Sequence, residues 1–308
     1  MPGTFLITSA TGRQGTSTAR LLLAQGAQVH ALVRDPTSPA SLTLKSLGAT
    51  LFKGGFDDVP AITAAIQGVT GVFLNTFPNF ADPNGETRAA ETFVAAARAA
   101  GTVTSFVVST VFKTDALEDW STLKGEFPFL AQYYASKAGV ERVVRASGFV
   151  YTILRPGWLN HNYIGAGVEY HFPEYAKERV LTVSSPRGWR MEHLDAEDVG
   201  QFAAAALLDP GRFAGKELDL VNELLTFEEI AAHLGEALGA EVKVKYRIPE
   251  ETAEARKVLP TIERQLWAPT TKSGDAFKLA EYGFRLTTFK EFLEREKTAI
   301  RKTVGIES

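Results

Sequence analysis

The first 26 residues constrain the fold of this chain most strongly. An apolar run from Thr4 to Thr8 leads into a short segment with glycines at positions 12 and 15, and a helical pattern then continues to Gly26. A strand, a tight glycine turn and a helix in this order place unpaired backbone N–H groups at the positive end of a helix, which is a favourable site for a pyrophosphate. We expect Gly12 and Gly15 where backbone and phosphate approach too closely for a side chain.

The match to the three-glycine dinucleotide fingerprint is incomplete, because Ser9 stands where the fingerprint has its first glycine. A βα turn that binds nothing is the alternative interpretation. The context favours binding, since a second strand, Gln28 to Val33, follows the helix and ends in a charged residue about 20 residues on, as the fingerprint requires. The residues of the turn that we expect to hold the cofactor are Ser9, Thr11, Gly12, Arg13, Gln14 and Gly15.

The charged residue after the second strand is Arg34, where an NAD-specific enzyme usually carries an acid. An acid bonds the ribose 2′-hydroxyl and repels a 2′-phosphate, whereas an arginine accommodates the phosphate. Arg13 is close enough in sequence to assist. The pair predicts NADP(H) in preference to NAD(H), and the alternative is that both arginines are solvated surface charges.

Composition limits the other classes of function. The chain has 308 residues, 45% of them hydrophobic, and a formal net charge of −3 with its basic residues dispersed. We therefore expect a large core and no direct nucleic-acid binding. Cysteine is absent, which excludes disulfides and a cysteine nucleophile. No apolar run is long enough to span a membrane and no signal peptide precedes the first strand, so we expect a cytoplasmic protein.

Further strands alternate with helices at a regular spacing. The expected strands are 50–55, 71–76 and 104–110, and the expected helices are 40–47, 61–67 and 86–100. This alternation predicts an α/β fold with a doubly wound parallel sheet.

Polar residues at the ends of two of these strands are candidates for cofactor contacts. Asp58, followed by Pro60, is suited to cap a helix, while Asp57 is placed to contact the adenine end of a dinucleotide; a cap is the alternative role for either aspartate. Asn75 and Thr76 end the fourth strand, and ligands collect at the carboxyl ends of parallel strands. A simple turn is the alternative there.

Tyr133 and Lys137 are four residues apart in a helical run, so both side chains leave the same face. A lysine ammonium beside a phenol favours phenolate, and such a phenol can exchange a proton with a substrate oxygen while hydride moves at the nicotinamide. Ser109 or Thr110, at the end of the fifth strand, is placed to hold that oxygen. A packed ring beside a solvated lysine is the alternative explanation.

The sixth strand, from about residue 149, ends at Pro156 and Gly157, and aromatic and amide side chains follow it. We expect Pro156 and Trp158 to contact the cofactor and Asn160, His161 and Tyr163 to contact the substrate. A structural aromatic cluster, with a hydrogen-bonded histidine, is the alternative. No carboxylate or second histidine stands at ligand spacing, so no metal site is expected.

Taken together, these motifs resemble those of an NmrA-like member of the atypical short-chain dehydrogenase/reductase superfamily. The resemblance rests on the Thr-Gly-x-x-Gly turn, on Val33-Arg34, and on Leu154-Arg155-Pro156-Gly157-Trp158 followed by Asn162-Tyr163. It extends through the segments 195–200, 215–220 and 225–230, and thus over nearly the whole chain.

The resemblance implies a Rossmann NAD(P)-binding domain, residues 1–155, and a smaller C-terminal α+β substrate lobe, residues 156–308, with NADP(H) between them. The segment of about 192–222 is expected to return to the Rossmann core. Residues 172–190 are expected to form a loop-rich substrate wall. Thr226 with Glu229, and Thr288 with Glu291, have capping-box spacing and predict two further helix starts.

Members of this family resemble either reductases or redox sensors without the catalytic tyrosine, and Tyr133 favours a reductase. The predicted function is an NADP(H)-dependent oxidoreductase that reduces a small apolar carbonyl, quinone or conjugated double bond, with Tyr133 as proton donor. The alternative is a non-catalytic NADP(H) sensor that acts through a regulatory protein partner or as a homodimer. A scaffold that binds no nucleotide is a third interpretation, and it requires Gly12, Gly15 and Arg34 all to be accidental.

Overall fold

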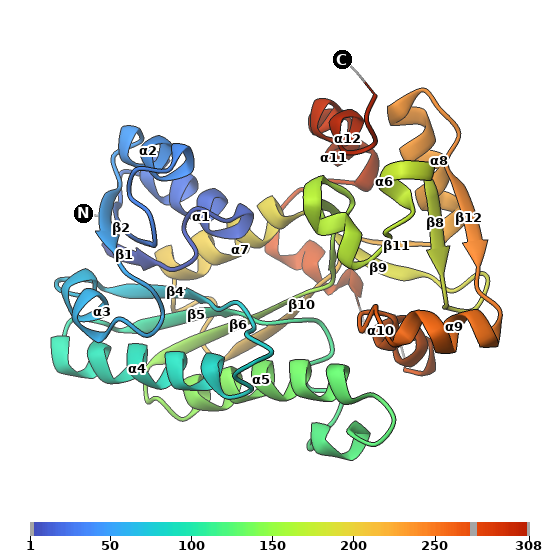
Figure 1. Cartoon of the computed structure of the whole chain (residues 1–308). Coiled ribbons are helices and arrows are strands. Elements are labelled where there is room, and N and C mark those ends of the chain that lie inside the picture. The colour runs from blue at the N-terminus through green and yellow to red at the C-terminus, as the bar shows by residue number, and fades with distance from the viewer. Residues whose placement is uncertain (1–2, 272–275, 307–308) are drawn as a thin grey trace. The chain divides into compact units, whose positions relative to one another are not determined.

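A computed structural model describes residues 3–271 and 276–306 of the chain, which form two compact units (Figure 1). Unit 1 contains the chain up to Asp119 together with Gln132–Pro156 and Ala196–Leu220. Unit 2 contains Trp120–Ala131, Gly157–Asp195 and the chain from Val221 onward. Each unit is therefore assembled from three separate stretches of the chain.

Unit 1 is built on a seven-stranded sheet in which every pair of neighbours is parallel. The order across the sheet is β10-β6-β5-β4-β1-β2-β3, so the strand order reverses between β1 and β4. This confirms the predicted doubly wound sheet. The strands are β1 (Thr4–Ile7), β2 (Gln28–Val33), β3 (Thr50–Lys53), β4 (Gly71–Asn75), β5 (Ser105–Ser109), β6 (Val150–Pro156) and β10 (Lys216–Leu220).

Helices cover both faces of this sheet, with α3, α4 and α5 on one face and α1 and α7 on the other (Figure 1). The crossing of α1 and α7 is close, because a Cβ atom on Gly200 would lie 2.3 Å from Ser17 Oγ. Asp58 caps α3 through Ala61 N, as predicted. The helices are α1 (Arg13–Ala24), α2 (Pro39–Ser46), α3 (Val59–Ala65), α4 (Gly85–Ala100), α5 (Pro128–Arg145) and α7 (Ala196–Leu208).

Unit 2 contains two small sheets. In the first, β9 (Met191–Leu194) lies between antiparallel β11 (Glu223–Leu225) and parallel β7 (Trp158–Leu159). In the second, β8 (Val180–Val183) pairs in parallel with β12 (Lys243–Tyr246). Residues 172–190, which the sequence predicts to be loop-rich, also contain β8 and the short helix α6 (Tyr175–Glu178).

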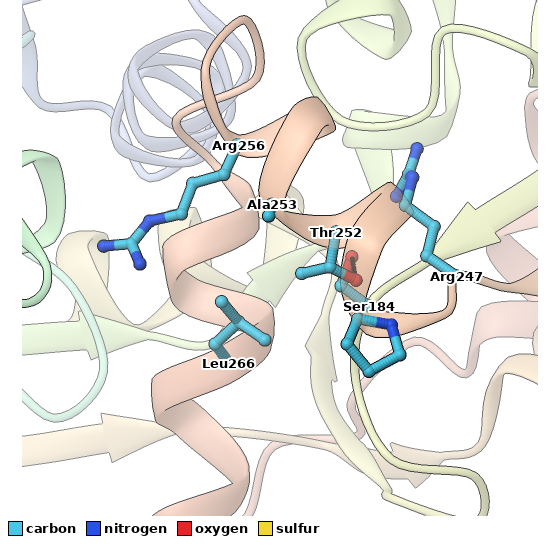
Figure 2. Close-up of a pocket in the computed structure, with 7 residues that line it drawn as sticks. Ser184, Arg247, Thr252, Ala253, Arg256 and Leu266 are labelled. Atoms are coloured by element: carbon cyan, nitrogen blue, oxygen red, sulfur yellow. Dashed lines mark hydrogen bonds between the residues drawn. The ribbon is translucent and has the colours of Figure 1, made fainter.

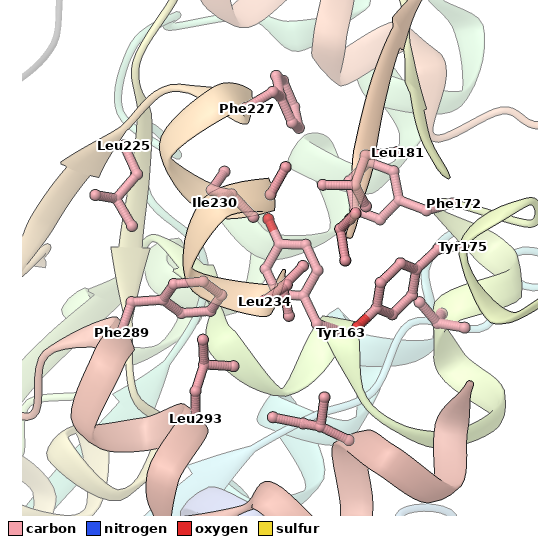
Figure 3. Close-up of a cluster of buried hydrophobic side chains, with 14 of the residues drawn as sticks. Tyr163, Phe172, Tyr175, Leu181, Leu225, Phe227, Ile230, Leu234, Phe289 and Leu293 are labelled. Atoms are coloured by element: carbon pink, nitrogen blue, oxygen red, sulfur yellow. The ribbon is translucent and has the colours of Figure 1, made fainter. Parts of the chain in front are cut away.

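The helices of unit 2 supply most of its core. Both predicted capping boxes are confirmed, at Thr226 for α8 and at Thr288 for α11. A pocket lies beside α9 and α10 (Figure 2). Side chains from α8, α11 and β8 surround the buried rings of Tyr163 and Phe172 (Figure 3). The remaining helices are α8 (Phe227–Leu238), α9 (Pro249–Arg256), α10 (Ile262–Trp267), α11 (Phe289–Arg295) and α12 (Lys297–Thr303).

A buried arginine ties α5 to the edge of the unit 1 sheet. The side chain of Arg155, on β6, is 2% exposed and donates to Glu141 of α5 from both Nε (3.0 Å) and Nη2 (2.8 Å). The same guanidinium donates to Asp115 and to Glu217 of β10. Four acceptor oxygens around one guanidinium satisfy four of its five N–H groups.

Asp219, paired in register with Arg155, adds another acid to this cluster. Its Oδ1 is buried and has no hydrogen-bond partner among the described residues. Burial raises the pKa of Asp219 to about 6, with Asp115 adding to the shift and Arg155 opposing it. The proton is thus held more tightly in the folded state than in the unfolded chain, where the pKa is near its ordinary value of 3.8.

Replacing Asp219 by Asn is expected to stabilise the protein at neutral pH. Because the folded-state pKa of Asp219 is raised, protonated Asp219 contributes its full stability below pH 3.8, the ordinary pKa. The wild type loses that contribution as the pH rises through 6. Urea unfolding should therefore give Asp219→Asn a larger free energy of unfolding than the wild type. This difference should grow with pH and reach about 1 kcal/mol by pH ~8. A gap of equal size at low and high pH would contradict the raised pKa.

Candidate functional site

The glycine turn between β1 and α1 is built around one close backbone approach. Gly12 N donates to the Ser9 carbonyl over 2.9 Å, and a Cβ atom on Gly15 would lie 2.3 Å from that same oxygen. Gly12, in an extended conformation, precedes the helix and has no side chain to cap it. The start of α1 therefore has no side-chain cap, and such a helix start is suited to an anionic ligand.

Ser9 adopts the backbone conformation for which the fingerprint normally uses glycine. Its φ angle is 45°, in the left-handed region, which costs a residue with a Cβ atom about 1 kcal/mol. Its Oγ donates to the Asn75 carbonyl over 2.8 Å. This hydrogen bond offsets part of the strain and ties the turn to β4.

The carboxyl ends of three neighbouring strands meet beside this turn. Asn75 ends β4 and pairs in register with Ser109 at the end of β5. The Asn75 side chain donates to Gln14 Oε1 over 3.2 Å, which joins β4 to the first turn of α1. Ser9, Gln14, Asn75 and Ser109 are therefore brought to one edge of the sheet.

Arg34 and Asp57 lie on the surface of the same unit. Arg34 follows β2, the strand next to β1, and forms no ion pair with any residue that the structure describes. Arg13 and Thr11 are also exposed. Asp57 is exposed beside the cap residue Asp58, whose carboxylate is occupied by α3.

Lys137 is buried in a cluster of polar groups at the end of β4. Its Nζ lies 2.6 Å from Glu86 Oε1 and donates to the Thr76 carbonyl over 3.1 Å. Glu86 also accepts from Thr76 Oγ1 (2.6 Å) and Ser136 Oγ (2.8 Å). The carboxylate is thus fully engaged, and it offsets the desolvated charge of the lysine.

Tyr133, one turn before Lys137 on α5, is half-buried. Lys137 Nζ lies 5.8 Å from the centre of the Tyr133 ring. The Lys137 ammonium therefore lies near the Tyr133 ring, as the four-residue spacing predicts. The same ammonium is also paired with the Glu86 carboxylate.

Close packing of two helices creates this cluster. A Cβ atom on Gly139 of α5 would lie 2.1 Å from Thr87 Oγ1 of α4, so a larger residue would force the Thr87 side chain to move. Glu86 and Ser136 are functional candidates that the sequence analysis missed. Glu86 resembles an ordinary first-turn acid of a helix, and its only distinguishing signal is the helix contact itself.

Ser109 and Thr110 have different environments. Thr110 Oγ1 donates to Glu141 over 2.7 Å, in the network around Arg155. Ser109 Oγ is buried and has no hydrogen-bond partner among residues 3–271 and 276–306. An unpaired buried hydroxyl at a strand end is suited to a ligand oxygen.

The predicted residues after β6 divide between the two units. Pro156 ends β6 in unit 1, and Trp158 begins β7 in the Gly157–Asp195 stretch of unit 2. Tyr163 is fully buried in the unit 2 core, with its hydroxyl 3.1 Å from His193 Nε2. Since His193 Nδ1 faces the Met191 carbonyl over 2.9 Å and must donate there, Nε2 accepts from Tyr163.

Asn160 and His161 begin a short 3₁₀ helix of unit 2. Asn160 is buried, with 1% of its surface exposed. The His161 ring packs edge-on against Phe292, and each of its nitrogens lies 3.9 Å from a carboxylate, of Asp195 and of Glu296 respectively. Tyr163 and His161 therefore have structural contacts within their own unit, whereas Asn160 Oδ1 is buried and has no hydrogen-bond partner among the described residues.

Within the described part of the chain, no group of three or more His, Asp or Glu side chains is placed to hold a metal ion. The helices of the same residues include none with the length and hydropathy needed to cross a membrane.

Comparison with known proteins identifies relatives across most of the chain. The sequence pattern of the NmrA-like family matches residues 1–275. An NmrA-like family domain-containing oxidoreductase of Aspergillus hancockii is 31% identical over 79% of this chain and 76% of its own length. A protein of the same description from Cladobotryum is 28% identical over 89% of this chain and 86% of its own. Quinone oxidoreductase 2 of Escherichia coli is 26% identical over 82% and 80%.

Solved structures share the fold. A mutant of NmrA has a TM-score of 0.76 at 23% identity, covering 99% of this chain and 98% of that one. NmrA, a negative transcriptional regulator, in complex with NADP has a TM-score of 0.68 at 21% identity, with 98% and 94% covered. The Escherichia coli NADPH-dependent quinone oxidoreductase complexed with NADPH has a TM-score of 0.73 at 21% identity, with 94% and 99% covered.

Replacing Gly15 by Ala is expected to destabilise the protein by about 1–3 kcal/mol, because the new methyl group must displace the Ser9 carbonyl and the Ala10 Cα atom. Urea unfolding measures the change. Gly125→Ala is the matched control, since its φ is not positive and no atom lies within 4 Å of the added Cβ. Equal stability of the two variants would show that the turn relaxes without cost.

Proposed function

The chain belongs to the NmrA-like family, and on that premise we propose that it is an NADP(H)-dependent oxidoreductase. The proposed substrate is small and apolar and carries a carbonyl, a quinone or a conjugated double bond. The observation that carries the proposal is the Lys137 ammonium, held by Glu86 and the Thr76 carbonyl, 5.8 Å from the centre of the Tyr133 ring. The naming of relatives as oxidoreductases supports it.

The glycine turn fits a dinucleotide. Gly15 lets the Ser9 carbonyl pack against the start of α1, and that helix start, which has no side-chain cap, is suited to the pyrophosphate. Arg34 is exposed and is the proposed partner of the 2′-phosphate, assisted by Arg13. The other cofactor contacts predicted from the sequence, including Asp57, Asn75, Pro156 and Trp158, remain proposals.

A bound NADPH supplies a hydride to the substrate carbon. Tyr133 then donates its hydroxyl proton to the substrate oxygen, which has gained the displaced electron pair. Lys137 stabilises the negative charge that develops on the phenol, and it has a third N–H group with which to hold a ribose hydroxyl. Ser109, whose hydroxyl is unpaired, is the proposed donor that orients the substrate oxygen, in preference to Thr110, whose hydroxyl is committed to Glu141.

A non-catalytic NADP(H) sensor is the second candidate. Its support is the Glu86 carboxylate, which pairs with Lys137 and offsets part of the charge that would act on Tyr133. In a sensor, this ion pair would serve to join α4, α5 and the end of β4. Turnover distinguishes the two functions.

Replacing Tyr133 by Phe is expected to lower kcat at least ~100-fold while NADPH still binds, because only the hydroxyl proton donor is removed. NADPH consumption with a panel of quinones, enones and aldehydes measures the rate, and NADPH fluorescence measures binding. Tyr151→Phe, on β6, is the matched control. If wild type binds NADPH tightly and turns over no member of the panel, the sensor function replaces the reductase.

Replacing Arg34 by Glu is expected to weaken NADPH binding at least ~10-fold and leave NADH binding nearly unchanged, because the acid repels the 2′-phosphate. Titration of each cofactor into both proteins gives the ratio of dissociation constants. An unchanged ratio would remove Arg34 from the 2′-phosphate site.

A further inference from the structure

Unit 2 contains a pocket of about 390 Å³ whose lining includes none of the residues used above. Its lining includes Arg247, Thr252, Ala253, Arg256 and Leu266 from the region of α9 and α10, and Ser184 from the end of β8. Figure 2 shows Arg247 and Arg256 on opposite sides of the pair formed by Ser184 and Thr252. A volume of this size accommodates a small organic ligand.

The lining carries two guanidinium groups and no carboxylate. Arg247 is the more buried of the two, with 5% of its side chain exposed. Its Nη1 donates to the Thr182 carbonyl over 2.9 Å, and its Nη2 forms an ion pair with Glu174 Oε1 over 3.6 Å. Burial lowers the pKa of Arg247, and the carboxylates of Glu174 and Glu251 oppose that shift.

Arg256 is held by partners that do not line the pocket. Its Nη2 donates to Glu263 Oε1 over 3.2 Å and also to the Glu126 carbonyl. Its guanidinium carbon lies 5.1 Å from the centre of the Phe127 ring. These contacts fix the position of a second positive charge beside the pocket.

The middle of the pocket has hydroxyl groups and an apolar wall. Thr252 Oγ1 donates to Ser184 Oγ over 3.2 Å, so the Ser184 hydroxyl can donate to a ligand in turn. Leu266 and Ala253 contribute apolar surface. The pocket therefore combines donors and positive charge with a hydrophobic contact.

We propose that this pocket binds a small organic anion, a carboxylate with a short aliphatic body. The carboxylate would accept from a guanidinium and a hydroxyl, and the aliphatic part would contact Leu266. Because the pocket shares no residue with the proposed reductase machinery, the proposal is independent of that function.

Isothermal titration of sodium hexanoate into the full-length protein tests the proposal, with neutral hexanamide as the matched probe. Hexanoate is expected to bind about 10-fold or more tightly than hexanamide, since charge-assisted hydrogen bonds are the stronger ones. Equal affinity of the two probes would overturn the proposal. The absence of hexanoate binding at ~10 mM would also overturn it, since a dissociation constant of ~10 mM needs only about 3 kcal/mol of binding free energy.

Two variants and one control variant test whether hexanoate binds in this pocket. Ala253→Phe fills the pocket from an exposed position and should abolish hexanoate binding without affecting the fold. Arg256→Gln should weaken binding about 5-fold or more, whereas Lys257→Gln, which removes a charge from the exposed ion pair with Glu254, should leave it unchanged. Hexanoate binding that survives Ala253→Phe would place the anion elsewhere and overturn the proposal.

Discussion

Unit 1 depends on the close contact between Gly15 and the Ser9 carbonyl. The missing side chain at Gly15 lets α1 begin directly against the end of β1, because a Cβ atom there would lie 2.3 Å from the Ser9 carbonyl oxygen, well inside van der Waals contact. That contact fixes the start of the helix, and the Ser9 and Gln14 bonds to Asn75 then hold β4 beside it. One steric constraint thus aligns the positive end of a helix with the edge of a parallel sheet.

The strands and helices of unit 1 could be predicted because apolar runs, glycines and caps signal them locally. The small sheets of unit 2 were not predicted. β8 and β12 are four residues each, and the alternation of lysines with Val244 and Tyr246 in β12 is a strand signal that the sequence analysis missed. Each of these strands exists because a distant strand pairs with it, and that pairing is decided by the packing of the whole unit. The capping box at Thr226, by contrast, needs only four consecutive residues and was predictable.

The candidate site was also predictable only in part. Tyr133 and Lys137 are four residues apart, and a helix is enough to place both side chains on one face, so their proximity could be predicted from the sequence. The role of Glu86 depends on how closely α4 and α5 pack, which Gly139 and Thr87 determine. Ser9 departs from the fingerprint in residue type yet keeps its backbone geometry, with a φ of 45°. A motif defined by residue type misses a position that is defined by conformation.

The crossing of α1 and α7 has a consequence for protein synthesis. Helix α1 is among the first segments to leave the ribosome. Helix α7, which packs on α1 at Gly200, and the edge strand β10 are made only after about two thirds of the chain. The stretch Gly157–Asp195, which belongs to the other unit, emerges in between. Unit 1 therefore cannot fold to completion as an early, N-terminal domain, and the part of its sheet that α7 covers stays exposed until translation is well advanced.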